Sequence, residues 1–415
     1  MTAPASPAGQ AQALTPLEEQ ALAAVQADEL VELLQALIRC DSSFPPGDCR
    51  SAVAELEQRF RKAGIETAAY ARSETQPNLV AWLGEKDAHP RLVYHAHIDT
   101  VPAGDRSRWS VDPFGGALVD GRIFGRGAGD DKGSAAAQAV ALLVLKRLGV
   151  QIPGCLQVAL VSDEESGALN GTHWLRQAGL LQPDALVIGE QTANQVCIAE
   201  RVACGIDLTV FGKSAHGAMP WAGDNAVLKT ARVLGWLESR LFPRLRARTH
   251  PYLPPATLNV GRIQGGIQWS IVPETCKVEM DRRLLPGETR EAAVEEIRAE
   301  LEAYAAQVEP LRYELYSGGE VAGNVNTPPD DPLVQTAAAV VRDVTGEDRG
   351  LGGYVQTSDG RWYARDGIPI IHFGPSDPAV AHSADENISI AQLVEAAKVL
   401  VVLALRFYKL SGPAA

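Results

Sequence analysis

Short apolar runs alternate with helix-forming segments through much of this 415-residue chain, and several runs end in acidic or histidine-bearing loops. Leu156–Val161 is apolar except at Gln157, which is typical of a strand covered on both faces. Ala185–Ile188 and Ile368–Phe373 follow the same pattern, and the alanine-rich segment Ser134–Leu148 predicts a helix. This alternation indicates an α/β fold with a mainly parallel sheet and helices on both faces. Ligands collect beyond the carboxyl ends of such strands, so we expect a site in the loops there.

One strand is predicted to begin with the apolar run Leu92–Tyr94 and to end with two histidines and an aspartate as it leaves the sheet. Alternate side chains of a strand share a face, so His95, His97 and Asp99 are predicted to line up. A carboxylate two residues after a histidine is well placed to orient a metal-binding ring. Taken alone, the motif favours a polar strand end that faces water. The acidic and histidine clusters in later loops favour the interpretation that this strand end binds a metal.

The middle of the chain changes rhythm and predicts a second domain. Strands and helices follow there in the order β-α-β-β-α-β, the order of a small split-βαβ sandwich, so we expect an inserted α+β domain. The predicted boundaries are a catalytic domain in two parts, 1–201 and 320–415, around an inserted domain at 202–319. Residues 1–16 are predicted to be a flexible tail, 17–39 a helix, and Pro243–Pro255 a link after a helix ending at Leu241.

The composition of the chain limits which classes of partner it can bind and where in the cell it works. The formal net charge of -13 argues against nucleic acid as a partner. Apolar runs such as Val399–Leu405 are too short to span a bilayer, so no membrane partner is expected. The first residues lack the features of a signal peptide, and the six cysteines form no CxxC pair. We therefore expect reduced thiols and a cytoplasmic protein.

Carboxylates and imidazoles are the side chains that zinc and similar cations prefer. Two cations about 3.5–4 Å apart need a carboxylate that bridges them and similar ligands on each side. The chain offers such a set at the loops described above: His97, Asp130, Glu165, Glu190 and His382.

Five motifs in order, HAHIDTVP, GRGAGDDKG, SDEESG, IGE and AHSADE, resemble those of the co-catalytic zinc metallopeptidase family. Its members include acetylornithine deacetylase, succinyl-diaminopimelate desuccinylase, aminoacylase-1 and glutamate carboxypeptidase. The resemblance covers essentially the whole chain past the tail, including the inserted domain. Any one motif alone would be a weak signal, but five in order are specific.

The resemblance implies two Zn²⁺ ions per chain, with Co²⁺ or Mn²⁺ as alternatives. His97 and Glu190 would hold one ion, Glu165 and His382 the other, and Asp130 would bridge them.

It also implies two catalytic roles. Asp99 would orient His97, and Glu164 would be the general base that takes a proton from the metal-bound water, giving a hydroxide nucleophile, and passes it to the leaving amine. The peptide bond between Asp130 and Asp131 is expected to be cis.

On the substrate side, His216 matches a histidine that reaches into the partner subunit's active site, so the resemblance implies a homodimer formed through the inserted domain. Arg283 matches an arginine that binds the substrate carboxylate. An ordinary residue on the exposed face of its strand is an equal alternative for Arg283.

The chain departs from the family pattern at two places. Ser270 stands where the family usually has asparagine. Three residues, Tyr354 to Gln356, separate Gly352-Gly353 from Thr357-Ser358-Asp359, whereas the deacylases run these together. Both departures lie among the expected substrate-binding residues, Ser270 and Thr357 included, so they leave the substrate open.

These observations favour a dizinc hydrolase that cleaves the amide bond of an N-acyl amino acid, as a deacetylase or desuccinylase does. The alternative within the family is a dipeptidase or carboxypeptidase. A binding protein that keeps the fold without chemistry is a third hypothesis, and the complete ligand set argues against it.

Overall fold

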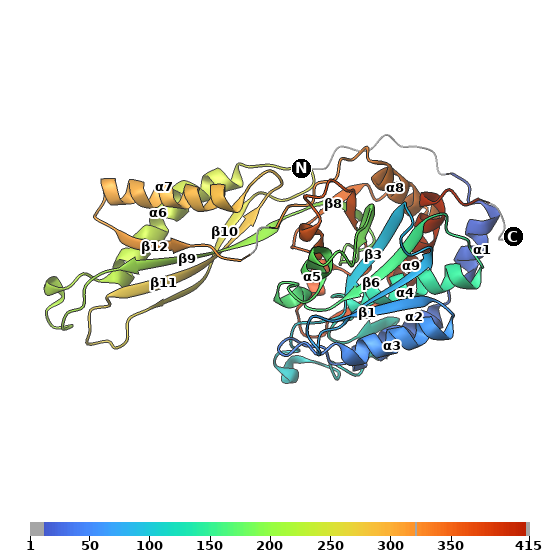
Figure 1. Ribbon diagram of the computed structural model, residues 1–415. Coiled ribbons are helices and arrows are strands. Elements are labelled where there is room, and N and C mark those ends of the chain that lie inside the picture. Colours follow the sequence, from blue (N-terminus) through green and yellow to red (C-terminus); the bar gives the residue numbers. More distant parts are fainter. Residues whose placement is uncertain (1–11, 320–321, 412–415) are drawn as a thin grey trace. The chain divides into compact units, whose positions relative to one another are not determined.

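The computed structural model describes residues 12–319 and 322–411 and contains two compact units (Figure 1). Unit 1 comprises Met1–Ala199, Val325–Tyr354 and Ser358–Ala415, and unit 2 comprises Glu200–Asn324 and Val355–Thr357. Among the described residues, no helix has the length and apolar character needed to cross a membrane. Most of the predicted tail, residues 1–11, lies outside the described residues.

Unit 1 is built on an eight-stranded mixed sheet. In spatial order its strands are β1 (Glu66–Tyr70), β2 (Asn78–Gly84), β6 (Cys155–Val161), β3 (Arg91–His97), β7 (Ala185–Ile188), β14 (Ile370–His372), β8 (Val196–Glu200) and β13 (Leu351–Tyr354). The four central strands, β6, β3, β7 and β14, pair in parallel, whereas β1, β2 and β8 pair antiparallel. Unit 1 also contains a separate three-stranded sheet, with the spatial order β15 (Asn387–Ser389), β5 (Arg122–Phe124) and β4 (Ala117–Val119).

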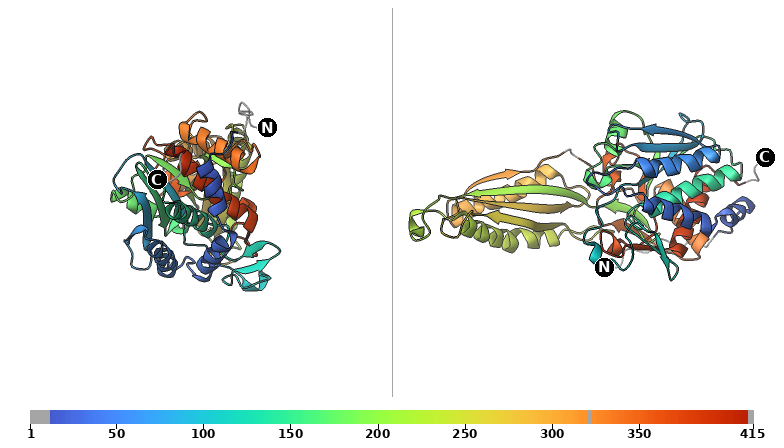
Figure 2. Two further views of the ribbon diagram at one scale, coloured as in Figure 1. Left: turned by 90° about the vertical axis from the view of Figure 1, so that its right-hand side faces the viewer. Right: turned by 90° about the horizontal axis from the view of Figure 1, so that it is seen from below.

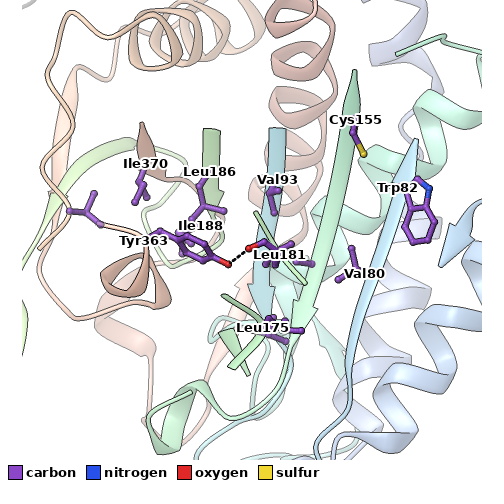
Figure 3. Packing of buried hydrophobic residues seen from close by; sticks show 13 residues of the cluster. Val80, Trp82, Val93, Cys155, Leu175, Leu181, Leu186, Ile188, Tyr363 and Ile370 are labelled. Atoms are coloured by element: carbon purple, nitrogen blue, oxygen red, sulfur yellow. Dashed lines mark hydrogen bonds between the residues drawn. The ribbon is translucent and has the colours of Figure 1, made fainter. Parts of the chain in front are cut away.

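Helices cover both faces of this sheet. They are α1 (Pro16–Ala24), α2 (Ala27–Arg39), α3 (Arg50–Lys62), α4 (Lys132–Arg147), α5 (Thr172–Gln177), α8 (Pro332–Thr345) and α9 (Ile390–Phe407). Neighbouring residues of β3 show the two faces, since the Tyr94 hydroxyl donates to the Leu400 carbonyl of α9 and His95 contacts Thr172 of α5. Figure 3 shows apolar side chains packed near α5, where the Tyr363 hydroxyl donates to the Leu181 carbonyl. The apolar runs are therefore buried strands, as predicted.

Unit 2 is a four-stranded antiparallel sheet with two helices on one face (Figures 1 and 2). Its strands, in spatial order, are β10 (Thr257–Gly265), β11 (Thr275–Leu284), β9 (Val202–Phe211) and β12 (Arg312–Tyr316), and its helices are α6 (Ala226–Arg246) and α7 (Arg290–Gln307). Along the chain the order is β-α-β-β-α-β. The predicted fold class, an α/β unit plus an inserted α+β split-βαβ unit, is confirmed.

Two predicted element boundaries were wrong. The segment 17–39 forms two helices, and the first begins at Pro16, within the predicted tail, because Thr15 and Glu18 form a reciprocal capping box. Helix α6 does not end at Leu241 but continues through Pro243 to Arg246. Leu241 and Leu245 are both buried, so packing of this face holds the last turn despite the proline.

Candidate metal centre

The polar loops meet at one edge of the unit 1 sheet because the strands before them are parallel. His97 is the last residue of β3, and Glu164 and Glu165 lie in a short 3-10 turn after β6. Glu190 follows β7, and His382 lies in the loop after β14. Carboxyl ends of parallel strands point the same way, which is why residues far apart in sequence converge here.

Asp130, in the loop before α4, lies between the two histidines. Its Oδ1 is 3.0 Å from Nε2 of His97, and its Oδ2 is 3.1 Å from Nε2 of His382. The same nitrogen of His382 is 3.2 Å from Oε1 of Glu165. The ligand atoms therefore form two groups that share Asp130: His97, Asp130 and Glu190, and Asp130, Glu165 and His382.

The donor set fits two zinc-like cations. Two ligands bound at about 2.0–2.1 Å to a tetrahedral zinc ion lie about 3.3 Å apart. The distances around Asp130, 3.0 to 3.2 Å, are close to that separation. The structure thus brings together all five residues that the sequence predicted as metal ligands.

Asp99 contacts His97 and the turn after β6 at once. Nδ1 of His97 is 3.0 Å from the Asp99 carbonyl oxygen and 3.5 Å from its carboxylate Oδ1. The carboxylate accepts hydrogen bonds from the backbone N–H groups of Glu164 and Glu165, at 3.2 and 3.1 Å. The shorter contact to His97 is thus made by the backbone of Asp99, while its carboxylate fixes the turn that carries both glutamates.

The electrostatics of the cluster reflect crowded carboxylates. Burial raises the pKa of Glu165 to about 7, against the opposing hydrogen bond from His382. Burial, with the charges of Asp131 and Asp130, also raises the pKa of Glu190 well above its usual value. Hydrogen bonds to Asp130 and Glu165 raise the pKa of His382 to about 10. Such crowding of negative groups suits a site that holds cations.

The adjacent glutamates have different partners. Oε1 of Glu165 faces His382, whereas Oε1 of Glu164 forms an ion pair with the Arg361 guanidinium, with Nη1 at 2.9 Å. Asp163, whose backbone is left-handed with φ 74°, comes directly before the turn that carries both glutamates. Glu165 therefore lies in a group of candidate ligand atoms, and Glu164 pairs with Arg361 beside that group.

A buried ion pair between Arg126 and Glu386 holds the loop that carries Asp130. Arg126 donates to Oε2 of Glu386, while Oε1 of Glu386 accepts the backbone N–H groups of Gly129 and Asp130 at 2.8 and 3.0 Å. The peptide bond between Asp130 and Asp131 is cis, as the resemblance implied.

Sequence reasoning missed three residues that bind the site carboxylates: Arg361 on Glu164, Arg126 on Glu386, and Tyr354 on Glu190. Tyr354 and Arg361 flank or follow the Thr357-Ser358-Asp359 motif, so the motif marked the region. Their contacts span 164 and 197 positions and leave no local pattern in the sequence.

The four predicted substrate residues lie in unit 2, where Arg283 contacts Thr357 and the loop of His216 contacts the loop of Ser270. Nη1 of Arg283 donates to Oγ1 of Thr357 at 3.2 Å, and Nε of Arg283 donates to Asp281 at 2.9 Å. His216 is exposed, and the next residue, Gly217, donates its N–H to the Ser270 carbonyl at 2.6 Å.

Comparison with known proteins agrees with this geometry. A model of peptidase family M20/M25/M40 matches residues 93–406. A succinyl-diaminopimelate desuccinylase of Bordetella petrii is 32% identical over 375 residues, which cover 88% of this chain and 94% of that protein.

Two solved structures share the fold. The di-peptidase Dug1p of Saccharomyces cerevisiae matches with a TM-score of 0.75 at 14% identity, over 94% of this chain and 98% of that one. The YXEP protein of Bacillus subtilis, described as a dinuclear metal binding peptidase, matches with a TM-score of 0.68 at 17% identity, over 92% and 99%. From the family match, the identity with the desuccinylase and these folds together, it follows that the chain belongs to peptidase family M20/M25/M40.

Proposed function

We propose that the protein is a dizinc hydrolase that cleaves the amide bond of an N-acyl amino acid. The observation that carries the proposal is the Asp130 carboxylate, which presents one oxygen to His97 and the other to His382. The relative named succinyl-diaminopimelate desuccinylase supports an N-succinyl or N-acetyl amino acid as substrate.

In this proposal His97 and Glu190 hold one cation, Glu165 and His382 hold the other, and Asp130 bridges them. The two groups of ligand atoms that share Asp130 support this division. Two bound cations supply the chemistry of lowering the pKa of a water and polarising the scissile carbonyl.

Glu164 is the proposed general base. Because its Oε1 is paired with Arg361, its Oε2 is the atom that takes the proton from water and returns it to the leaving amine. The hydrogen bonds from the Glu164 and Glu165 N–H groups to Asp99 keep the turn fixed while the proton moves.

Arg283 is the proposed partner of the substrate carboxylate, with Thr357 holding the guanidinium at 3.2 Å. A guanidinium can bind a carboxylate with two parallel hydrogen bonds, which suits this role.

The proposed homodimer forms through unit 2. This unit exposes large apolar side chains, with Trp221 at 80%, Ile267 at 88% and Trp269 at 93% exposed. Exposed aromatic side chains of this kind are enriched at protein interfaces. His216 and Ser270 lie in the same two loops, so a dimer there would place His216 near a partner. A cytoplasmic location is supported by the six cysteines, all of which are free thiols.

The test is a substrate screen with the purified protein loaded with Zn²⁺, Co²⁺ or Mn²⁺. N-succinyl and N-acetyl amino acids and dipeptides are compared by the rate at which free amine appears. Faster release from the acylated amino acids is expected; faster release from dipeptides would favour the peptidase alternative.

Glu164→Ala tests the chemistry separately. It is expected to lower turnover by about 10²–10⁴-fold while zinc content stays near two ions per chain. Glu165→Ala is the matched comparison, because it is expected to lose zinc as well as turnover. An active Glu164→Ala variant would show that another group is the base.

A further inference from the structure

Tyr354 is a buried tyrosine in the three-residue stretch that separates the double glycine from Thr357. It is the last residue of β13, and its hydroxyl donates to Oε2 of Glu190 at 2.7 Å. The hydroxyl also lies 3.3 Å from Oε1 of Gln191. A hydroxyl has one hydrogen to donate, and the closer carboxylate oxygen of Glu190 is the better placed acceptor.

The ring of Tyr354 is held in place by its neighbours. It stacks on the ring of His372, the last residue of β14, with centroids 5.1 Å apart and planes inclined by 18°. Nε2 of His372 is in turn 2.8 Å from the Ser358 hydroxyl. The stacking restricts rotation of the Tyr354 ring, so its hydroxyl is held in position to donate to Glu190.

We propose that Tyr354 is a positioning residue that fixes the Glu190 carboxylate for one of the two cations. This inference rests on the proposed dizinc function. Both hydrogen bonds that reach the Glu190 carboxylate in the described part of the chain end on Oε2: the one from Tyr354, and a longer one of 3.4 Å from Gln191 Nε2. Oε1 is thereby left for the cation that Glu190 shares with His97 and Asp130.

The proposal predicts an effect on one cation only. Hydrogen-bonding partners of metal ligands typically change metal affinity by about 10–100-fold when they are removed. Glu190 belongs to the group with His97 and does not belong to the group with Glu165 and His382. A tyrosine that merely satisfied its own buried hydroxyl would affect both cations equally, or neither.

Tyr354→Phe removes the hydroxyl and keeps the ring. The matched control is Tyr363→Phe, because Tyr363 is equally buried, at 1% exposed against 4%, and donates to the Leu181 carbonyl instead of a site carboxylate (Figure 3). Metal-free wild type and both variants are titrated with Zn²⁺ against a competing chelator, and thermal unfolding of the metal-free proteins is measured alongside.

The expected result is that the wild type and Tyr363→Phe bind two Zn²⁺ alike, while Tyr354→Phe binds one of them about 10–100-fold more weakly. The visible spectrum of the Co²⁺-loaded protein is expected to change in Tyr354→Phe alone, which gives a second readout of the ligand geometry. Equal Zn²⁺ affinities in the wild type and Tyr354→Phe, or equal losses in both variants, would overturn the assignment of Tyr354. A wild type that binds no Zn²⁺ would instead refute the proposed function.

Discussion

Glu386→Gln is a direct test of how the fold holds Asp130. Arg126 and Glu386 are 2% and 0% exposed, so their ion pair is withdrawn from water. The glutamine keeps an oxygen that can accept the N–H groups of Gly129 and Asp130. Its amide NH₂, however, would face the donor groups of Arg126, which now lose their carboxylate.

The magnitude follows from the burial of the guanidinium. Breaking a buried ion pair by removing one partner typically costs about 3–5 kcal/mol, because the remaining charge stays desolvated and unpaired. The hydrogen bond from Arg126 Nη2 to the Ser383 carbonyl, at 3.3 Å, compensates for little of this loss. We expect Glu386→Gln to lower the free energy of unfolding of unit 1 by about 3–5 kcal/mol. Because Asp130 contacts both ligand groups, the affinity for both Zn²⁺ ions should fall together.

The assay is urea unfolding of the metal-free protein, followed by Zn²⁺ titration of the folded variant. Glu288→Gln is the matched control in unit 2, where Glu288 pairs with the buried Arg282 at 2.8 Å. It should destabilise unit 2 through the same physics and leave Zn²⁺ affinity unchanged. A Glu386→Gln protein within about 1 kcal/mol of the wild type, a shift no larger than that of a typical single mutation, would refute the reasoning.

Three further predictions can be checked on the same protein. Chelation of the metal should lower the unfolding midpoint, and Zn²⁺ at about 100 times its dissociation constant should restore about 2.7 kcal/mol per site. Gly374→Ala would place a Cβ 2.5 Å from the Glu190 carbonyl oxygen, so it should lower the free energy of unfolding by about 1–3 kcal/mol and weaken Zn²⁺ binding. Gly235→Ala is the control, because its Cβ would lie in open space on α6; it should stabilise the protein by about 0.5–1 kcal/mol in thermal unfolding. Burial raises the pKa of Glu288, but hydrogen bonds from the Leu285 N–H, Arg248 and Arg282 outweigh it and hold that pKa below its usual value. The stability that Glu288 contributes is therefore present above about pH 4.3 and is lost as the pH falls through the pKa of the folded protein. Urea unfolding of Glu288→Gln should lack this loss of stability at acid pH.

The strands of the site could be predicted because their signal is local. Ala185–Ile188 is apolar without interruption and Leu156–Val161 is apolar except at Gln157, and burial on both faces favours that composition. Strand β13 was missed, since Leu351–Tyr354 contains two glycines and becomes a strand only by pairing at the edge of the sheet. Helix α6 was cut short for a related reason: the proline is visible in the sequence, and the packing of Leu245 is not.

The metal centre was predictable at the level of its ligands, since strand-end acids and histidines and five ordered motifs marked them. Their roles as ligands stay a prediction that metal analysis can test. What the sequence could not supply is the pairing of each ligand. The contact from Tyr354 to Glu190 depends on β13 lying at the right edge of the sheet, and no periodicity along the chain encodes that distance.

The pairing of side chains is also what separates the roles of two chemically identical neighbours. Glu164 and Glu165 follow one another in a single turn. Their backbone N–H groups both donate to the carboxylate of Asp99, so their backbone hydrogen bonds do not distinguish them. Their side chains differ only in what they meet: Glu165 faces His382, and Glu164 faces Arg361. A cation bound to Glu165 would satisfy one carboxylate, while the Arg361 guanidinium pairs with the other, which lies outside that ligand group. The proposed division between a metal ligand and a proton acceptor therefore depends on Arg361 as much as on the glutamates, and Arg361→Met should lower turnover while leaving two Zn²⁺ bound.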